Sequence, residues 1–203
     1  MFEIIAVTNR AICRGDFLGR IGEIAASGVS AVILREKDMA PEDYGRLAER
    51  AGEICRLRGA DFIAHTFFDE AVSIGYKKIH LPMPLLEKIR ESREVPQDII
   101  IGASVHSAED AHRAVSLGAG YLVAGHVFKT DCKKGLEGRG LRFLSEICGQ
   151  SPVPVYAIGG ISERNIASVR KAGASGVCLM SSFMTDPDPK NYTARLRQSA
   201  LER

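Results

Sequence analysis

The residues best suited to chemistry lie in one segment, 125–140, which reads GHVFKTDCKKGLEGRG. His126 follows the apolar run YLVA, and Thr130, Lys133 and Lys134 come soon after it. An imidazole titrates near neutral pH and can accept or donate a proton, whereas hydroxyl and ammonium groups suit an anionic ligand. The composition is poor for a helix or a strand. The segment therefore predicts a loop in which His126 is a candidate catalytic acid or base.

Two further motifs suggest a phosphate site. AIGGIS (157–162) holds the pair Gly159 and Gly160, and LMSS (179–182) holds Met180, Ser181 and Ser182. Adjacent glycines let backbone N–H groups approach an anion with no Cβ in the way, and a helix beginning near Ser162 would add free N–H groups. For the glycine pair alone, a tight turn is the structural alternative.

A third motif, LREKD (34–38), places Arg35 at the end of an apolar run and Lys37 two residues later. Arginine grips a carboxylate or phosphate through two parallel hydrogen bonds, although a salt-bridge cluster is the alternative interpretation. Ser104 lies near the end of the apolar run at 99–105, and His106 follows that run. For His106 a contact with ligand and a structural hydrogen bond are both open, whereas His65 and His80 end two other runs where they could line the pocket.

The elements that must position these groups form a regular alternation. Eight apolar runs indicate strands, at 2–7, 30–35, 61–65, 77–80, 99–105, 120–125, 154–159 and 175–180. Helical patterns at 41–59, 107–118 and 162–173 lie between them. Continuous apolar runs are typical of parallel strands buried on both faces. We expect one α/β domain over residues 1–203, a (β/α)8 TIM barrel whose site lies at the carboxyl ends of the strands. An open doubly wound sheet is the alternative.

Composition excludes several function classes. A formal net charge of +2 gives no reason to expect nucleic acid or a membrane surface as a partner, and no apolar run approaches a membrane span. The N-terminus lacks the pattern of a secretory signal, and five cysteines without a CxxC pair suggest a reducing compartment, so we expect a cytoplasmic protein. No phosphate-binding Walker loop and no carboxylate cluster at a predicted strand end occurs. We therefore expect no cofactor and no metal.

With these motifs together, the chain resembles the thiamine phosphate synthase superfamily along nearly its full length. The pieces that carry the resemblance are LREKD, IGASVHS, AGY before VAGHVFKTDCKKG, PVYAIGGIS and AGASGVCLMSS. Within the superfamily it looks most like the thiazole tautomerase (TenI) branch, since the synthases typically carry proline where this chain has His126. The synthases also carry Asn-Asp after the third strand and an aspartate after the fourth, which hold magnesium and diphosphate. Here those places read Ala64-His65-Thr66 and His80-Leu81-Pro82-Met83.

The resemblance implies an isomerase of thiamine biosynthesis that aromatises a carboxythiazole phosphate tautomer by a proton shift. His126 would be the base. The ligand-binding residues would be Arg35, Lys37, Ser104, Thr130, Lys133, Lys134, Gly159, Gly160, Met180, Ser181 and Ser182. The partner would be the small-molecule thiazole phosphate, and the family favours homodimers. A thiamine phosphate synthase, which is a transferase, and a non-catalytic thiazole-phosphate-binding regulator are the alternatives.

Overall fold

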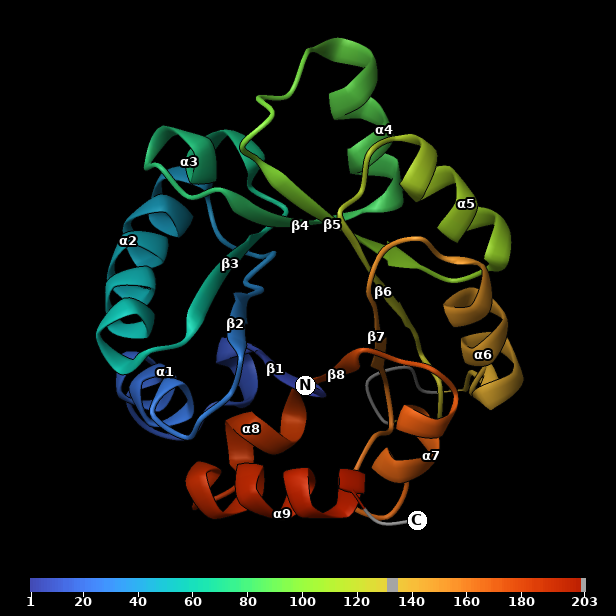
Figure 1. The fold of residues 1–203 in the computed structure, drawn as a ribbon. Helices are drawn as coiled ribbons and strands as arrows, with labels where there is room; N and C mark the ends of the chain where they lie inside the picture. Colours follow the sequence, from blue (N-terminus) through green and yellow to red (C-terminus); the bar gives the residue numbers. More distant parts are fainter. Residues whose placement is uncertain (131–134, 202–203) are drawn as a thin grey trace. The chain divides into compact units, whose positions relative to one another are not determined.

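The computed structural model describes residues 1–130 and 135–201, in which eight strands alternate with helices (Figure 1). The strands follow one another in chain order and close into a barrel. They are β1 (Glu3–Val7), β2 (Ala31–Leu34), β3 (Asp61–His65), β4 (Lys78–Pro82), β5 (Ile100–Val105), β6 (Tyr121–Gly125), β7 (Val155–Ile158) and β8 (Gly176–Leu179). The predicted (β/α)8 barrel is confirmed, and the open-sheet alternative is wrong.

Helices follow the strands as the barrel requires. The described elements are η1 (Arg10–Ile12), α1 (Phe17–Ala25), α2 (Pro41–Arg58), α3 (Phe68–Ser73), α4 (Met83–Ser92), α5 (Ala108–Ser116), α6 (Gly140–Gln150), α7 (Ile166–Lys171), α8 (Ser181–Thr185) and α9 (Pro189–Leu201). The predicted helices at 41–59 and 107–118 are α2 and α5. Gly59 ends α2 in the left-handed conformation, and the Ser107 hydroxyl caps α5 by accepting from the Asp110 N–H.

The third predicted helix, 162–173, is shorter than expected. The regular helix begins only at Ile166, although the Ser162 carbonyl already accepts from the Asn165 and Ile166 N–H groups at 3.1 and 3.0 Å. The Asn165 carboxamide oxygen accepts from the Ser162 N–H at 2.8 Å, and its nitrogen donates to the Gly160 carbonyl at 2.9 Å. The Ser162 N–H is therefore bound within the turn. The contribution of the other N–H groups at this helix start to a phosphate site stays a prediction.

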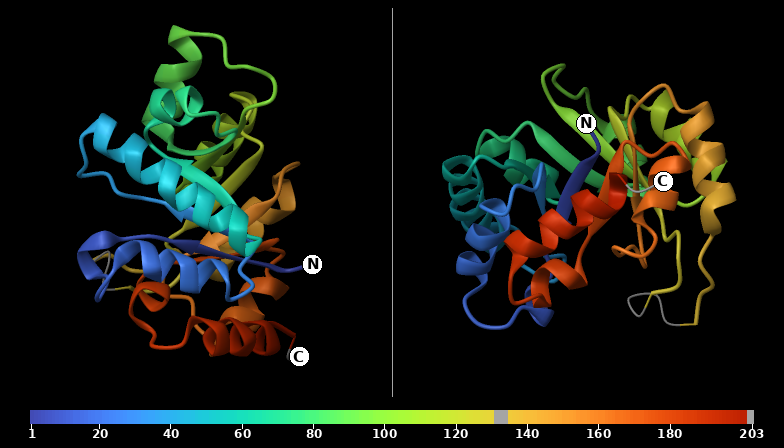
Figure 2. Two further views of the ribbon diagram at one scale, coloured as in Figure 1. Left: turned by 90° about the vertical axis from the view of Figure 1, so that its left-hand side faces the viewer. Right: turned by 60° about the horizontal axis from the view of Figure 1, so that its bottom comes forward.

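The chain divides into two compact units. We call residues Ile4–His80 with Leu179–Ala194 the N-terminal unit, and Met1–Glu3, Leu81–Cys178 and Arg195–Arg203 the C-terminal unit. In the N-terminal unit β1, β2, β3 and β4 pair in parallel, and α1 packs beside α2 (Figure 2, left). The register places Leu34 opposite Ala64 and His65 opposite His80, so these strand ends lie close together.

The C-terminal unit repeats the arrangement with β5, β6, β7 and β8, and α5 packs against α6. Gly102 faces Tyr121 across the β5–β6 pair, and a Cβ at Gly102 would lie 1.9 Å from the Tyr121 ring. The tyrosine ring thus fills the space that the glycine leaves open. Tyr121 also meets the ring of Tyr156 edge-on at 5.7 Å between centroids.

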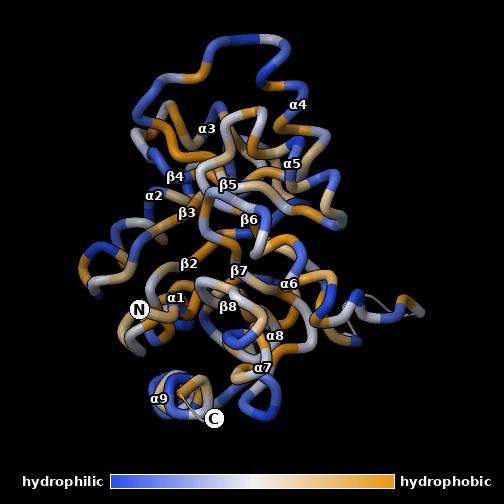
Figure 3. The backbone as a smooth tube through the Cα atoms, turned by 45° about the vertical axis from the view of Figure 1, so that its right-hand side comes forward, coloured by the Kyte–Doolittle hydropathy of each residue, from blue (hydrophilic) through white to orange (hydrophobic). Residues whose placement is uncertain are grey.

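The hydropathy of each element matches its place in the fold. Hydrophobic colours gather on strands such as β3, whereas α9 carries hydrophilic and hydrophobic residues together (Figure 3). Every residue of β2 and β8 is buried, as expected for parallel strands covered on both faces. Among the helices of residues 1–130 and 135–201, none is long and apolar enough to cross a membrane.

One buried hydroxyl joins α2 to the strand ends. Tyr44 is fully buried; its hydroxyl donates to the Leu34 carbonyl at 2.9 Å and accepts from the His65 N–H at 2.8 Å. Tyr44→Phe keeps the packed ring but leaves both buried groups without this partner, so we expect a loss of about 1–3 kcal/mol in the free energy of unfolding, measured in urea. Tyr76→Phe is the control, since that hydroxyl makes only a long, exposed 3.4 Å bond. Equal losses in both variants would refute this account.

Candidate functional site

In the C-terminal unit, His126 follows directly after Gly125, the last residue of β6. The side chain of His126 is 8% exposed, and its Nε2 atom is buried with no hydrogen-bond partner among the residues that the structure describes. A buried polar atom without a partner is rare and costs stability. A hydrogen bond from this atom to a ligand would remove the cost, and that role of His126 stays a prediction.

Gly159 lies against His126 and explains the first glycine of the AIGGIS motif. Its φ is +100°, and a Cβ there would lie 2.3 Å from the Cβ of His126 and 2.8 Å from its Cα. Two backbone hydrogen bonds join this turn to the strand end, from Val127 to the Ile158 carbonyl and from Phe128 to the Gly159 carbonyl. The predicted histidine and the predicted glycine turn thus form one cluster.

Gly160 is required for a similar reason. Its φ is +66°, and a Cβ there would lie 2.5 Å from the Lys129 carbonyl oxygen and 2.8 Å from the Phe128 Cβ. Both glycines are therefore positions where the chain passes too close for a side chain. The predicted tight turn and the predicted approach to an anion need the same geometry.

The structure gives the positions of two further predicted site residues of this unit. Ser104 lies in β5 opposite Val123, and Thr130 lies beyond Phe128; both are half-buried. Lys133 and Lys134 lie outside the described residues. His106, for which two roles were left open, makes a structural contact, because its Nδ1 lies 2.7 Å from the Gly125 carbonyl oxygen.

In the N-terminal unit, Glu36 holds the LREKD motif in place, although it was not among the predicted site residues. Glu36 is 3% exposed, and its carboxylate accepts from the Thr8 hydroxyl at 2.6 Å and from the Arg10 N–H at 3.1 and 3.0 Å. Thr8 in turn accepts from the Arg35 N–H at 2.9 Å. Burial raises the pKa of Glu36, opposed by these hydrogen bonds.

These contacts tie the ends of β1 and β2 together around Glu36. The alternative interpretation, in which Arg35, Glu36 and Lys37 form a salt-bridge cluster, stays a prediction. Asp38 pairs with Arg10 at 3.0 Å on the surface, while Arg35 is half-buried and Lys37 is exposed.

Met180, Ser181 and Ser182 belong to the same unit. The two serines open α8, which has five residues and packs against η1. Met180 lies at the helix start, where its sulfur accepts a long contact of 4.0 Å from the Asn9 amide. These residues therefore stand beside the segment that follows β1. The phosphate site that they would share with Gly159 and Gly160 stays a prediction.

Two buried histidines face each other across β3 and β4: His65 ends β3, and His80 lies in β4 two residues before its end. His65 and His80 are opposite in register, 5% and 3% exposed, with ring centroids 5.5 Å apart. Burial lowers the pKa of His65 to about 2 and that of His80 to about 3. The positive charge of Lys37 lowers both pKa values further, and His80 and Arg35 also act on His65. Both imidazoles are therefore neutral at pH 7.

The described residues do not fit a magnesium site. Within residues 1–130 and 135–201 no group of three or more His, Cys, Asp or Glu side chains could hold a metal ion. Magnesium requires oxygen ligands in near-octahedral geometry. At the ends of β3 and β4 the chain instead presents neutral imidazoles within the field of Lys37, which is unfavourable for a divalent cation.

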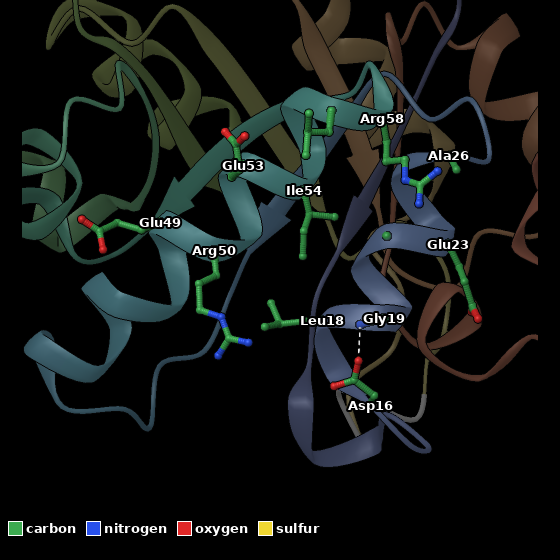
Figure 4. A pocket seen from close by; sticks show the side chains of 12 residues that line it. Asp16, Leu18, Gly19, Glu23, Ala26, Glu49, Arg50, Glu53, Ile54 and Arg58 are labelled. Carbon is green, nitrogen blue, oxygen red and sulfur yellow. Dashed lines mark hydrogen bonds between the residues drawn. The ribbon is translucent and has the colours of Figure 1, made fainter.

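A cavity of about 890 Å³ lies elsewhere in the N-terminal unit, between α1 and α2 (Figure 4). Leu18 and Ile54 face it, with Glu49 and Arg50 at its edge. At α1, the Asp16 side chain caps the Gly19 N–H at 2.7 Å. Of the described residues predicted for the functional site, none lines this cavity, so it is a feature of the helical layer.

Comparison with known proteins identifies the family. A family model described as "Thiamine monophosphate synthase" matches residues 4–183. A thiamine-phosphate synthase of Fusobacterium nucleatum is 32% identical over 93% of this chain and 92% of its own, and one of Methanoculleus marisnigri is 35% identical over 97% and 94%. The solved thiamine phosphate pyrophosphorylase of Pyrococcus furiosus superposes with a TM-score of 0.82 at 27% identity, covering 98% of this chain and 95% of that one.

These comparisons overturn the predicted activity. The two curated relatives are named as synthases, which are transferases, and the solved relative is named as a pyrophosphorylase; none of the three is named as an isomerase. The expectation of a thiazole tautomerase is therefore wrong. It rested on His126 in place of one proline and on the missing carboxylates after the third and fourth strands, whereas the similarity to synthases extends over nearly the full chain. With a family model that covers residues 4–183 and relatives matched along nearly their full length, the chain belongs to the thiamine monophosphate synthase family.

Proposed function

We propose that this chain is a transferase that forms thiamine phosphate. It would join a pyrimidine unit, supplied as its diphosphate, to a thiazole phosphate, with release of diphosphate. The observation that carries the proposal is the similarity at 32–35% identity over more than nine-tenths of the chain to proteins named thiamine-phosphate synthase. Likeness over this length includes every strand end on which a barrel builds its site.

The anionic groups of such substrates match the polar groups at the strand ends. Arg35 and Lys37 are the proposed ligands of the diphosphate, since a guanidinium binds two phosphate oxygens at once. For the thiazole phosphate the proposed ligands are backbone and hydroxyl groups, at Gly159, Gly160, Ser181 and Ser182. Ser104, Thr130, Lys133, Lys134 and Met180 complete the proposed substrate-binding set.

His126 is proposed to contact the bound substrate through Nε2. Its buried and unpartnered state among the described residues supports a hydrogen bond to substrate, because the bond would remove the desolvation penalty of that atom. In this role the imidazole orients a ring or a phosphate oxygen. We assign it no proton shift on the thiazole.

We propose no magnesium site in this chain, and the experiment below tests whether the reaction requires the ion. The neutral His65 and His80 stand where the resemblance implies carboxylate-bearing segments, and they do not fit the ion. On the residues present, the charge of a departing diphosphate is balanced by Arg35 and Lys37, which are fixed cations of the chain.

The test supplies both substrates to the purified protein and measures thiamine phosphate by chromatography, with EDTA and with added magnesium. We expect product in the wild type and a fall of about tenfold or more in kcat/KM for Arg35→Lys, because lysine cannot replace a bidentate contact. Arg56→Lys is the matched control, an exposed arginine paired with Glu53 on α2. No thiamine phosphate under either condition would end the proposal.

A further inference from the structure

The backbone around His126 is restrained on both sides. The carbonyl before it, that of Gly125, accepts two side-chain hydrogen bonds, and its own carbonyl accepts from the Arg139 N–H at 3.0 Å. The next residue, Val127, donates to the Ile158 carbonyl at 2.9 Å. In contrast, the Nε2 atom of the His126 ring is buried and meets no partner among residues 1–130 and 135–201. The chain thus specifies the placement of this residue closely and leaves its functional atom unsatisfied within that part of the protein.

His106 is the first of the two donors to Gly125. Its Nδ1 lies 2.7 Å from the carbonyl oxygen, which can only accept, so Nδ1 carries the proton. The backbone of His106 is itself held, because its N–H donates to the Asp110 carboxylate at 2.8 Å. Asp110 in turn donates its N–H to the Ser107 hydroxyl at 2.9 Å. The capping turn of α5 therefore orients His106, and His106 orients the peptide before His126.

Arg139 is the second donor. Its Nε donates to the Gly125 carbonyl at 3.2 Å, and its guanidinium lies 5.7 Å from the centre of the Phe143 ring. Since its backbone N–H also binds the His126 carbonyl, this one residue holds the peptide groups on both sides of His126. Arg139 stands in the GRG run of the loop and was not among the predicted site residues.

We propose that His106 and Arg139 are positioning residues, which hold the Gly125 carbonyl between them and so aim the imidazole of His126 at the substrate. Neither residue is proposed to contact substrate. The inference about orientation rests on the hydrogen bonds alone, and only its kinetic consequence rests on the proposed transferase function.

The decisive comparison uses two substitutions of His106. Asparagine can place an amide N–H near the position of Nδ1, whereas leucine has similar bulk and no donor. We expect the ring ¹H–¹⁵N signals of His126 to move in His106→Leu and to stay near their wild-type positions in His106→Asn. The chain has five histidines, so the signals can be assigned by loss in His126→Gln. His112→Asn is the control, an exposed residue of α5 that pairs with Gln150.

Steady-state kinetics distinguish a misoriented His126 ring from a loss of folded protein. We expect His106→Leu to lower kcat about tenfold or more with KM for thiazole phosphate within about twofold, and His106→Asn to restore most of the rate. Arg139→Met should repeat both effects, and it tests the proposal should His106→Leu fail to fold. Unchanged His126 signals in folded His106→Leu and Arg139→Met would overturn it, even if both variants melt at lower temperature. If the wild type makes no thiamine phosphate, the proposed function fails, while the His126 signals still decide this inference.

Discussion

Gly159→Ala is expected to lower kcat/KM by about a hundredfold while the protein still folds. The added Cβ would lie 2.3 Å from the His126 Cβ, a distance that real Cβ atoms do not tolerate, so His126 or the turn after β7 must move. A displacement of about 1 Å in a catalytic or binding group can cost about a hundredfold in rate. Steady-state kinetics with the two proposed substrates measure the effect.

The control for this prediction is Gly59→Ala, at the end of α2. Gly59 has φ +79°, also in the left-handed region, but a Cβ there would meet nothing within 4 Å. Both variants carry the cost of a left-handed alanine, about 1 kcal/mol, and only Gly159→Ala adds the collision. Equal kcat/KM values for the two variants would show that the close contact between Gly159 and His126 does not affect activity.

Lowering the pH is expected to destabilise this protein already at pH values well above those at which ordinary carboxylates titrate. The folded pKa values of His65 and His80, about 2 and about 3, lie below that of an unfolded histidine, near 6.5. Between these values the unfolded chain binds more protons, so stability present above pH 6.5 is lost as the pH falls. From pH 7 to 5.5 the pair should lose about 2.5 kcal/mol of unfolding free energy.

Urea unfolding at a series of pH values measures this loss. The double variant His65→Asn with His80→Asn should remove most of the pH dependence between 7 and 5.5, whatever its absolute stability. His112→Asn should retain the dependence, because His112 is exposed on α5. A wild-type stability that is flat over this interval would mean that the two imidazoles accept protons in the folded state, contrary to their burial.

The amino-acid sequence by itself determined the alternation of strands and helices and the ends at which polar groups gather. Apolar runs and capping residues such as Ser107 and Gly59 act over a few neighbouring positions, so their effect can be read locally. The sequence also predicted a turn that requires glycine at 159 and 160, although it did not predict which groups lie against them. The reaction class was not predicted, because His126 and the missing carboxylates after two strands outweighed motifs that are spread over the whole barrel.

Only the tertiary structure decided which polar groups meet. Glu36 binds Thr8 and Arg10, and His106 and Arg139 converge on the Gly125 carbonyl across many intervening residues. The neutrality of His65 and His80 is likewise a result of burial, since no local pattern lowers the pKa of a histidine so far. Hydrogen bonds and desolvation depend on distances between strands that the closed barrel sets, and those distances are properties of packing, which sequence spacing does not specify.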